Sequence, residues 1–283
     1  MKQHLGAVAL ILGLAVPAMA QVNEQNSSDS PTGSRITRPA PVGAQMSPEA
    51  TVAAAKERIA AMKRQNQLPD RATLQLLLSA EASLKDDTGM AAALEEEAAD
   101  YNAPADWAQV ISLTFNMPSL RDQDAIWLGR LLFVVGAPVS PNDASMIGGI
   151  ASQLAFFGDA VNAKAHGGGV DPDPAPRADT DKKTIPQQIA DQQAQDGAYN
   201  AKLAEALYSY GMYPQAEAAA TLAIQKGGNA DAAEAPMVLG QALTAEGKYD
   251  DAIAAFGKVT GGEATVRIAR LWADYAGVKK RGR

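Results

Sequence analysis

The side chains that usually carry catalysis or bind metal ions are few and scattered in this sequence. The chain has no cysteine and two histidines, of which only His166 lies beyond the N-terminal segment. One histidine, without a cysteine or a carboxylate at ligand spacing, does not make a transition-metal site. We therefore interpret His166 as a surface side chain, and we expect no metal ion and no cofactor.

Two groups of acidic residues could in principle do chemistry. Asp171, Asp173, Asp179 and Asp181 lack the glycine turn and the bidentate glutamate of a calcium loop, so they indicate a charged linker. The run 95–97 is three consecutive glutamates, which point in different directions on a helix and cannot face one another as an acid–base pair. We interpret this run as a solvated helix face. No phosphate-binding loop or nucleophile elbow occurs, so the sequence predicts no catalytic residue.

The first part of the chain is typical of a targeting segment. Residues 1–20 combine a basic start at Lys2, an apolar run too short to span a bilayer, and a small-residue cleavage site at Ala18 and Ala20. We expect a cleaved signal peptide and an exported protein, periplasmic or secreted. No cysteine follows the cleavage site to carry a lipid anchor. Residues 21–46, rich in Ser, Asn, Gly and Pro, predict a disordered leader.

The remaining chain has helical periodicity and no strand pattern of useful length, which predicts an all-α protein. We divide it into a helical region at 47–165, a Gly-, Pro- and Asp-rich mobile linker at 166–186, a second helical region at 187–278 and a frayed basic tail at 279–283. The 47% hydrophobic residues suffice for a large core, and the net charge of −7 argues against binding nucleic acid or anionic lipid.

Two segments of the second helical region repeat the same pattern of small and large residues 36 positions apart. A unit that cannot bury its own apolar face must stack on a neighbour, so this period predicts two helix–turn–helix units of a solenoid. The repeat-structural positions are Leu203, Ala204, Leu207, Gly211, Tyr213, Ala216 and Ala223 in the first unit, and Leu239, Gly240, Leu243, Gly247, Tyr249, Ala252 and Phe256 in the second.

This spacing resembles the tetratricopeptide repeat over residues 198–260. The usual closing proline is absent, Asn200 and Pro236 replace the first-helix tryptophan, and the period exceeds the usual length of about 34 residues. More broadly, 92–276 resembles secreted proteobacterial tetratricopeptide-repeat proteins of unassigned role, with 267–276 as a terminal capping helix. The resemblance implies an α-solenoid of antiparallel helix hairpins, a right-handed superhelix with degenerate hairpins in 47–165.

The resemblance also implies a binding surface, because the first helix of each repeat lines a concave groove. The outward positions of those helices are the expected partner contacts: Lys202, Glu205, Tyr208, Ser209, Met237, Gln241 and Thr244. Their mixed polar and apolar character suits an extended peptide. We expect an envelope scaffold or adaptor that binds a protein or peptide segment. The alternatives are a cell-wall-acting enzyme, which would need two carboxylates facing each other across the groove, and a self-associating structural protein.

Overall fold

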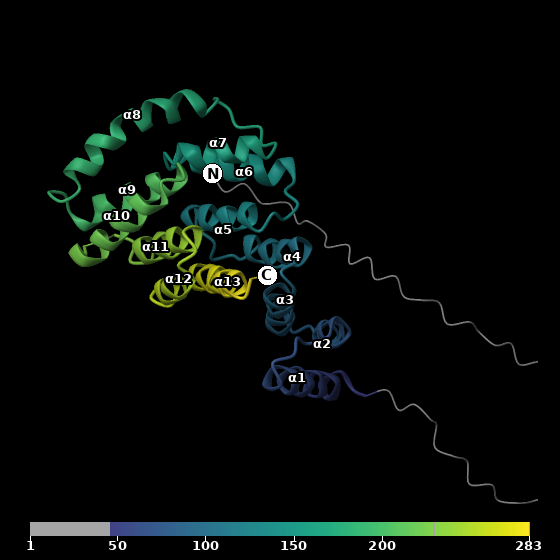
Figure 1. Cartoon of the computed structure of the whole chain (residues 1–283). Coiled ribbons are helices and arrows are strands. Elements are labelled where there is room, and N and C mark those ends of the chain that lie inside the picture. The colour runs from purple at the N-terminus through teal and green to yellow at the C-terminus, as the bar shows by residue number, and fades with distance from the viewer. Residues whose placement is uncertain (1–45, 229, 283) are drawn as a thin grey trace, which may run out of the picture. The chain divides into compact units, whose positions relative to one another are not determined.

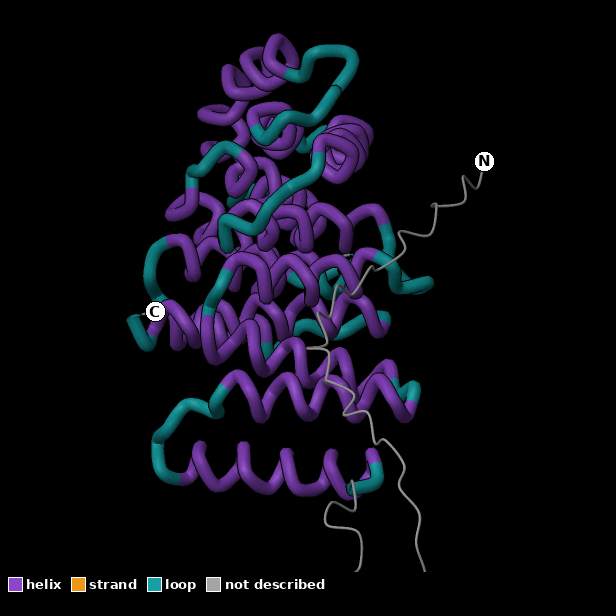
Figure 2. Tube along the Cα trace, turned by 90° about the vertical axis from the view of Figure 1, so that its right-hand side faces the viewer, coloured by secondary structure: helices purple, strands orange, loops and turns teal. Residues whose placement is uncertain are grey.

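The computed structural model describes residues 46–228 and 230–282, and over these ranges the chain is entirely α-helical (Figures 1 and 2). The prediction of an all-α protein is confirmed for these residues. The predicted signal peptide at 1–20 and all but the last residue of the predicted leader lie outside them. The thirteen described helices are α1 (Pro48–Arg64), α2 (Arg71–Leu84), α3 (Asp87–Tyr101), α4 (Pro104–Phe115), α5 (Asp122–Val134), α6 (Pro141–Gln153), α7 (Phe157–Ala165), α8 (Ala175–Asp191), α9 (Gly197–Ser209), α10 (Tyr213–Lys226), α11 (Glu234–Ala245), α12 (Tyr249–Phe256) and α13 (Glu263–Lys280).

Several helices begin where the sequence supplies a capping side chain. Ser47 accepts a hydrogen bond from the amide of Ala50, and Asp70 accepts one from the amide of Thr73 at 2.9 Å. Ser140 and Asp196 cap α6 and α9 in the same way. These oxygens satisfy amides that have no partner inside the helix, so the helix starts are fixed by local chemistry that is visible in the sequence.

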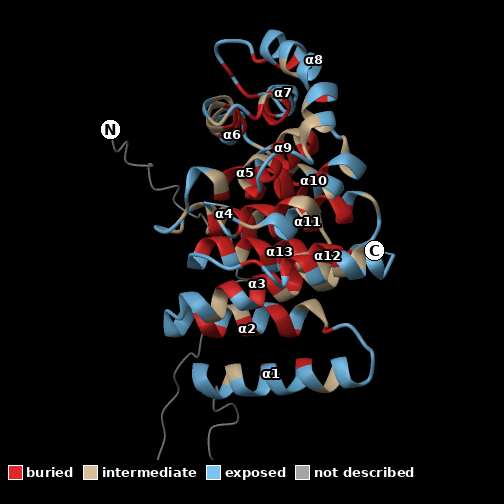
Figure 3. Cartoon of the chain, turned by 90° about the vertical axis from the view of Figure 1, so that its left-hand side faces the viewer, coloured by how far each residue is buried: buried red, intermediate tan, exposed pale blue. Residues whose placement is uncertain are grey.

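Each helix packs mainly against its neighbours along the chain, and the last helix also returns to the middle of the fold. Adjacent helices pair from α1 to α4 and again from α9 to α13, whereas α13 additionally contacts α3, α4 and α5. One apolar cluster therefore unites residues of α3 to α7 with residues of α11 to α13. Figure 3 shows buried residues in these helices and also in α9 and α10. The segment interpreted from the sequence as a terminal cap, 267–276, is the middle of α13, which contacts α3, α4, α5 and α11 as well as α12.

The two repeat units form equivalent hairpins, α9–α10 and α11–α12. Gly211 and Gly247 have φ angles of +74° and +77°, which a residue with a side chain adopts only under strain. A β-carbon placed on either glycine would lie 3.9 Å from the hydroxyl of the tyrosine two residues later. Of the predicted repeat-structural positions, all are buried except the two turn glycines, which are exposed, and Tyr213, Tyr249 and Leu239, which are half-buried. The 36-residue period is therefore a real structural repeat.

The prediction of a mobile linker at 166–186 is wrong for both halves of the segment. Residues 168–170 pack on α6, where Val170 fills the space above Gly148 and the amide of Gly169 donates to the Ser145 hydroxyl at 2.7 Å. The second half belongs to α8, which begins at Ala175, between the last two of the alternating prolines, and also contains Pro186. The missing side chains of the glycines allow the close approach to α6, and the alternating prolines exclude a helix only up to Pro174.

Three smaller interpretations also need correction. The continuous helical pattern from Ser140 through Phe157 predicts one helix, but the segment is divided between α6 and α7, because Ala155 adopts a left-handed conformation between them. The glutamates of 95–97 are not a solvated face: Glu95 is buried and pairs with Arg267 at 2.8 Å, because α3 is covered by α13 as well as by α2 and α4. The basic tail is not frayed over 279–282, since Lys279 and Lys280 extend α13 and Arg281 donates to a carbonyl of α3.

Candidate ligand-binding cleft

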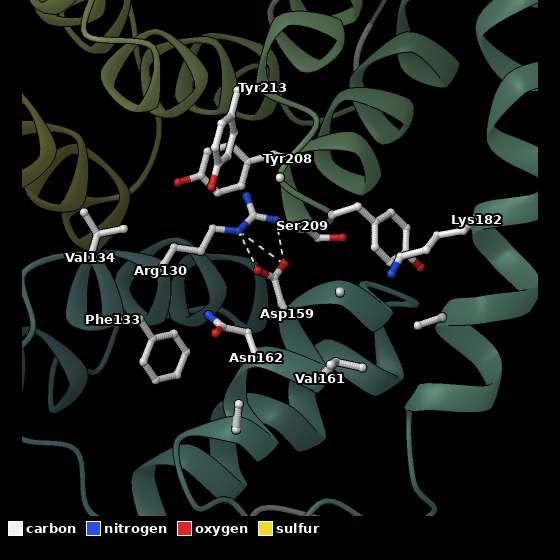
Figure 4. Close-up of a pocket in the computed structure, with 15 residues that line it drawn as sticks. Arg130, Phe133, Val134, Asp159, Val161, Asn162, Lys182, Tyr208, Ser209 and Tyr213 are labelled. Atoms are coloured by element: carbon white, nitrogen blue, oxygen red, sulfur yellow. Dashed lines mark hydrogen bonds and ion pairs between the residues drawn. The ribbon is translucent and has the colours of Figure 1, made fainter.

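A cleft of about 400 Å³ opens between α5, α7, α8 and the turn that joins α9 to α10 (Figure 4). Gly158 at the start of α7 makes this arrangement possible. A β-carbon there would lie 2.3 Å from the carbonyl oxygen of Ser209, so only glycine allows α7 to approach the end of α9 this closely. The tight turn at Gly211 then carries the chain to Tyr213 on the far side of the cleft.

Arg130 of α5 lies at the inner end of the cleft and joins three other helices. It donates to both carboxylate oxygens of Asp159 on α7, with a shortest distance of 2.7 Å. It also donates to the Glu205 carboxylate on α9 at 2.5 Å and to the Gln241 side chain on α11 at 2.9 Å. A longer contact to the backbone carbonyl of Glu205 occupies the remaining N–H. All five donors of the guanidinium are therefore used within the protein.

The charges around Arg130 keep it ionised despite complete burial. Burial alone would lower the pKa of Arg130, but the adjacent charges of Asp159 and Glu205 raise it above its ordinary value. The ring of Tyr208 packs 4.5 Å from the guanidinium, and burial in turn raises the pKa of the Tyr208 hydroxyl. Arg130 is a structural centre of this region, and it has no N–H left to offer a ligand.

Glu205 illustrates how the structure places the predicted groove residues. Its side chain is fully buried, where it accepts hydrogen bonds from the indole of Trp127 at 2.6 Å and from Gln123 at 3.2 Å, both on α5. Gln241 is equally buried, and its amide nitrogen has no hydrogen-bond partner. Helix α5 therefore covers this part of the expected groove from within the same chain.

The other predicted groove residues have different surroundings. Met237 and Thr244 are buried, the first in the main apolar cluster and the second donating to its own helix. Lys202 is exposed and pairs with Glu234 at 2.6 Å. Tyr208 and Ser209 are the two of the seven that line the cleft. The structure thus brings Glu205, Tyr208 and Gln241 together around Arg130 rather than along an open surface.

The partly or fully exposed groups of the cleft are the rings of Tyr210 and Tyr213 and the polar side chains of Lys182 and Asn162. Tyr210 and Tyr213 form part of the wall, and the ammonium of Lys182 lies 5.1 Å from the centre of the Tyr210 ring. Among the described residues, neither Lys182 nor the side chain of Asn162 makes an ion pair or a hydrogen bond. The Tyr210 hydroxyl donates to Asp181 at 2.7 Å, and burial together with this bond raises the pKa of Tyr210.

The lining of the cleft holds a single acidic group. Asp159 is the one carboxylate among the residues that line the cleft, and both of its oxygens accept from Arg130. Over residues 46–228 and 230–282, no group of three or more histidine, aspartate or glutamate side chains is arranged to hold a metal ion. The chemistry that the cleft offers is recognition by rings, an ammonium and an amide.

The sequence reasoning missed Arg130, Asp159, Asn162 and Lys182. One signal for Arg130 was present, since it is a lone charged residue within the apolar stretch from Ala125 to Val135. A charge in an otherwise buried helix requires a buried partner, which could have directed attention to α5. Lys182 had no such signal, because it lies in the segment that was assigned to a linker.

Glu234 gives the region a measurable dependence on pH. Burial, and then the nearby charge of Glu205, raise the pKa of Glu234 to about 7, although its bond to Lys202 acts in the opposite direction. The folded state therefore binds this proton more tightly than the unfolded state does. By linkage, the free energy of unfolding falls as the pH rises from about 4.5 to about 7.

We predict that Glu234→Gln removes this part of the pH dependence. The amide can still accept from Lys202 but does not titrate, so the fall in stability between pH 4.5 and pH 7 should be shallower than in the parent chain. Urea unfolding at four pH values in this range measures the slope. Glu263→Gln, at an exposed position on α13, is the matched control. Parallel slopes for Glu234→Gln and the parent chain would contradict the assignment.

Comparisons with known proteins add no relative to this picture: no protein-family model matches the chain, and the search of the curated proteins finds no match.

Proposed function

We propose that the chain is a tetratricopeptide-repeat-like adaptor, a right-handed solenoid of helix hairpins that binds a protein or peptide segment. The equivalent turns at Gly211 and Gly247, with Tyr213 and Tyr249 in matching places, support the repeat assignment. Ala216 and Ala252 are both fully buried where the second helix of each hairpin meets the first. Repeats of this kind present extended surfaces to partner chains, which is why binding is proposed rather than catalysis.

The proposed ligand surface is the cleft beside α7 and α8, in place of the groove expected from the repeats. The observation that carries this choice is the set of partly exposed groups in the cleft, where the rings of Tyr210 and Tyr213 are combined with the side chains of Lys182 and Asn162. Aromatic walls with a few polar groups are typical of ligand sites. The expected groove positions Glu205 and Gln241 are instead engaged with α5.

Binding is favoured over hydrolysis of cell-wall glycan by the number of acids in the cleft. Glycoside hydrolysis needs two carboxylates on opposite sides of the bond, and Asp159 alone lines the cleft. We further propose that the protein acts in the cell envelope, in its assembly or maintenance, on the basis of the signal-like residues 1–20. None of the described helices is long and apolar enough to cross a membrane.

We predict that Asn162→Trp abolishes recovery of the partner. The residue is exposed, so the indole should fill the cleft while the stability stays within about 0.5 kcal/mol of the parent chain. A steric conflict of even about 1.4 kcal/mol weakens binding tenfold. Affinity purification of tagged protein from the exporting cell, with partners quantified by mass spectrometry, measures the effect.

The matched control for this experiment is Gln75→Trp, on an exposed position in the middle of α2. It adds the same indole at a site that is not part of the cleft. The proposal predicts that Gln75→Trp recovers the partner at the parent level. Equal recovery by both tryptophan variants would show that the cleft is not the binding surface.

A further inference from the structure

We propose that α8 is a displaceable strap, and that the apolar face beneath it is a docking surface for an amphipathic helix of the partner protein. This inference rests on the proposed function and specifies the partner. The distinguishing feature of α8 is its weak attachment. Only Ala178 and Ile185 of its seventeen residues are buried, whereas eight of the thirteen residues of α9 are. Figure 3 shows α8 as one of the most exposed helices of the chain.

The face under α8 is apolar and continuous with the core of the repeat hairpins. Ile185 belongs to the cluster that Leu203 and Leu207 of α9 form with alanines of α10, and Ile189 packs against the edge of the same cluster. Three further contacts hold α8: the Asp181 bond to Tyr210, the Lys182 ammonium against the Tyr210 ring, and the Arg177 guanidinium 5.9 Å from the Phe157 ring of α7. When α8 lifts, this apolar surface is left without a cover and requires another apolar helix.

The sequence of α8 also lowers its own helix stability. Pro186 lies inside the helix, where it cannot donate a hydrogen bond to the carbonyl of Lys182 and where its ring crowds that carbonyl. The side chain of Pro186 is exposed, so it adds nothing to docking. A proline at an exposed position in the interior of a helix weakens the helix with no compensating contact, which keeps the undocked state of α8 accessible.

The segments on both sides of α8 are fixed to the rest of the protein. Before α8, Gly168 and Val170 pack against α6. After α8, the ammonium of Lys226 binds the backbone carbonyls of Gln193 and Gln195. Because both ends are anchored independently of the helix, α8 can leave its seat without disturbing the hairpins on either side.

The seat defines the helix that can replace α8. The replacing helix needs apolar residues with the spacing of Ala178, Ile185 and Ile189, which is i, i+7 and i+11. It also needs an acidic residue at the place of Asp181 to accept from the Tyr210 hydroxyl. The occupant is therefore an amphipathic helix with an acidic residue on the edge of its apolar stripe, bound by the helix-in-groove mode.

Hydrogen exchange and a peptide probe test this proposal on the full chain. In the parent protein, amides of α8 should exchange at least tenfold faster than those of α9, and Pro186→Ala should slow the exchange of α8 at least tenfold. The probe is a fluorescent peptide of residues 173–193 carrying Pro186→Ala. Its affinity should be at least tenfold higher for Ile185→Asp protein, whose own α8 is undocked, than for Pro186→Ala protein. A peptide with both isoleucines replaced by aspartate is the control and should not bind.

Two results would overturn the proposal. One is exchange in α8 as slow as in α9 in the parent chain. The other is an Ile185→Asp protein that keeps the parent melting temperature but does not bind the probe. If Ile185→Asp lowers the melting temperature, the proposal is judged by the hydrogen-exchange rates of α8 in the parent and Pro186→Ala proteins. The strap and the adaptor function can fail separately. If Asn162→Trp loses the partner but the amides of α8 exchange as slowly as those of α9, only the strap is refuted. If the peptide probe binds but Asn162→Trp recovers every partner at the parent level, only the adaptor function is refuted.

Discussion

Arg130→Met is expected to lower the free energy of unfolding by about 3–5 kcal/mol, because it leaves the carboxylates of Asp159 and Glu205 buried without their cation. The methionine occupies much of the same volume, so the loss reports the uncompensated charges more than a cavity. Thermal and urea unfolding at neutral pH measure the change, and the melting temperature should fall by about 10 °C.

Two controls separate this effect from the loss of any arginine. Arg58→Met breaks an exposed ion pair with Asp70 and should cost less than about 1 kcal/mol. Adding Asp159→Asn and Glu205→Gln to Arg130→Met should recover a large part of the loss, since the remaining side chains are neutral. A loss below about 1 kcal/mol for Arg130→Met alone would contradict the central place given to this residue.

Trp272→Ala should destabilise the protein by a similar amount, about 3–5 kcal/mol, because its side chain is 1% exposed and its removal leaves a large cavity. The indole of Trp272 donates to the backbone carbonyl of Trp127 at 2.9 Å, and its ring stacks on Phe256. The residue thus connects α13 to both α5 and α12. Urea unfolding measures the loss.

The control on the same helix is Val266→Ala, where the side chain is 43% exposed and the expected change is within about 0.5 kcal/mol. The comparison also tests the position of α13 in the fold. A peripheral cap would lose little when one of its residues is truncated, so a change below about 1 kcal/mol for Trp272→Ala would support the cap that the sequence suggested.

Local features of the fold could be predicted from sequence because they depend on neighbouring residues. Ser47 followed by Pro48, and Ser140 followed by Pro141, specify helix starts through capping and a preset φ angle, and α1 and α6 begin at these two prolines. Gly211 and Gly247 likewise indicate their turns by themselves. The period of the apolar positions then gives the helix type with no knowledge of what covers each face.

Features that depend on distant contacts could not be predicted in the same way. The sequence of 95–97 does not show that α13 covers Glu95. The contact joins Glu95 to Arg270, which lies more than 170 positions later in the chain. The repeat pattern predicts that Glu205 and Gln241 lie on the outward side of their hairpins, but both side chains are fully buried. Helix α5 packs on that side through long-range contacts. The side chains expected to contact a ligand therefore form hydrogen bonds with Trp127 and Arg130 of α5 instead.

The candidate site was inaccessible to sequence reasoning for a related reason. Lys182 and Asn162 approach the tyrosines of the α9–α10 turn only because Gly158 permits close packing of α7 against Ser209. No local sequence pattern shows that the carbonyl of Ser209, some fifty residues later, leaves no room for a side chain at Gly158. The same limit hid α8, which begins at Ala175, within the run of alternating prolines.

The most direct test of the cleft as the ligand surface is site-specific photo-crosslinking in the exporting cell. A photoreactive amino acid replaces Asn162 in one strain and Gln75 in another, both at exposed positions. The adaptor proposal predicts a discrete crosslinked partner from position 162 that is absent from position 75. Identical crosslinks from both positions, or none from 162 while the protein remains folded, would contradict it.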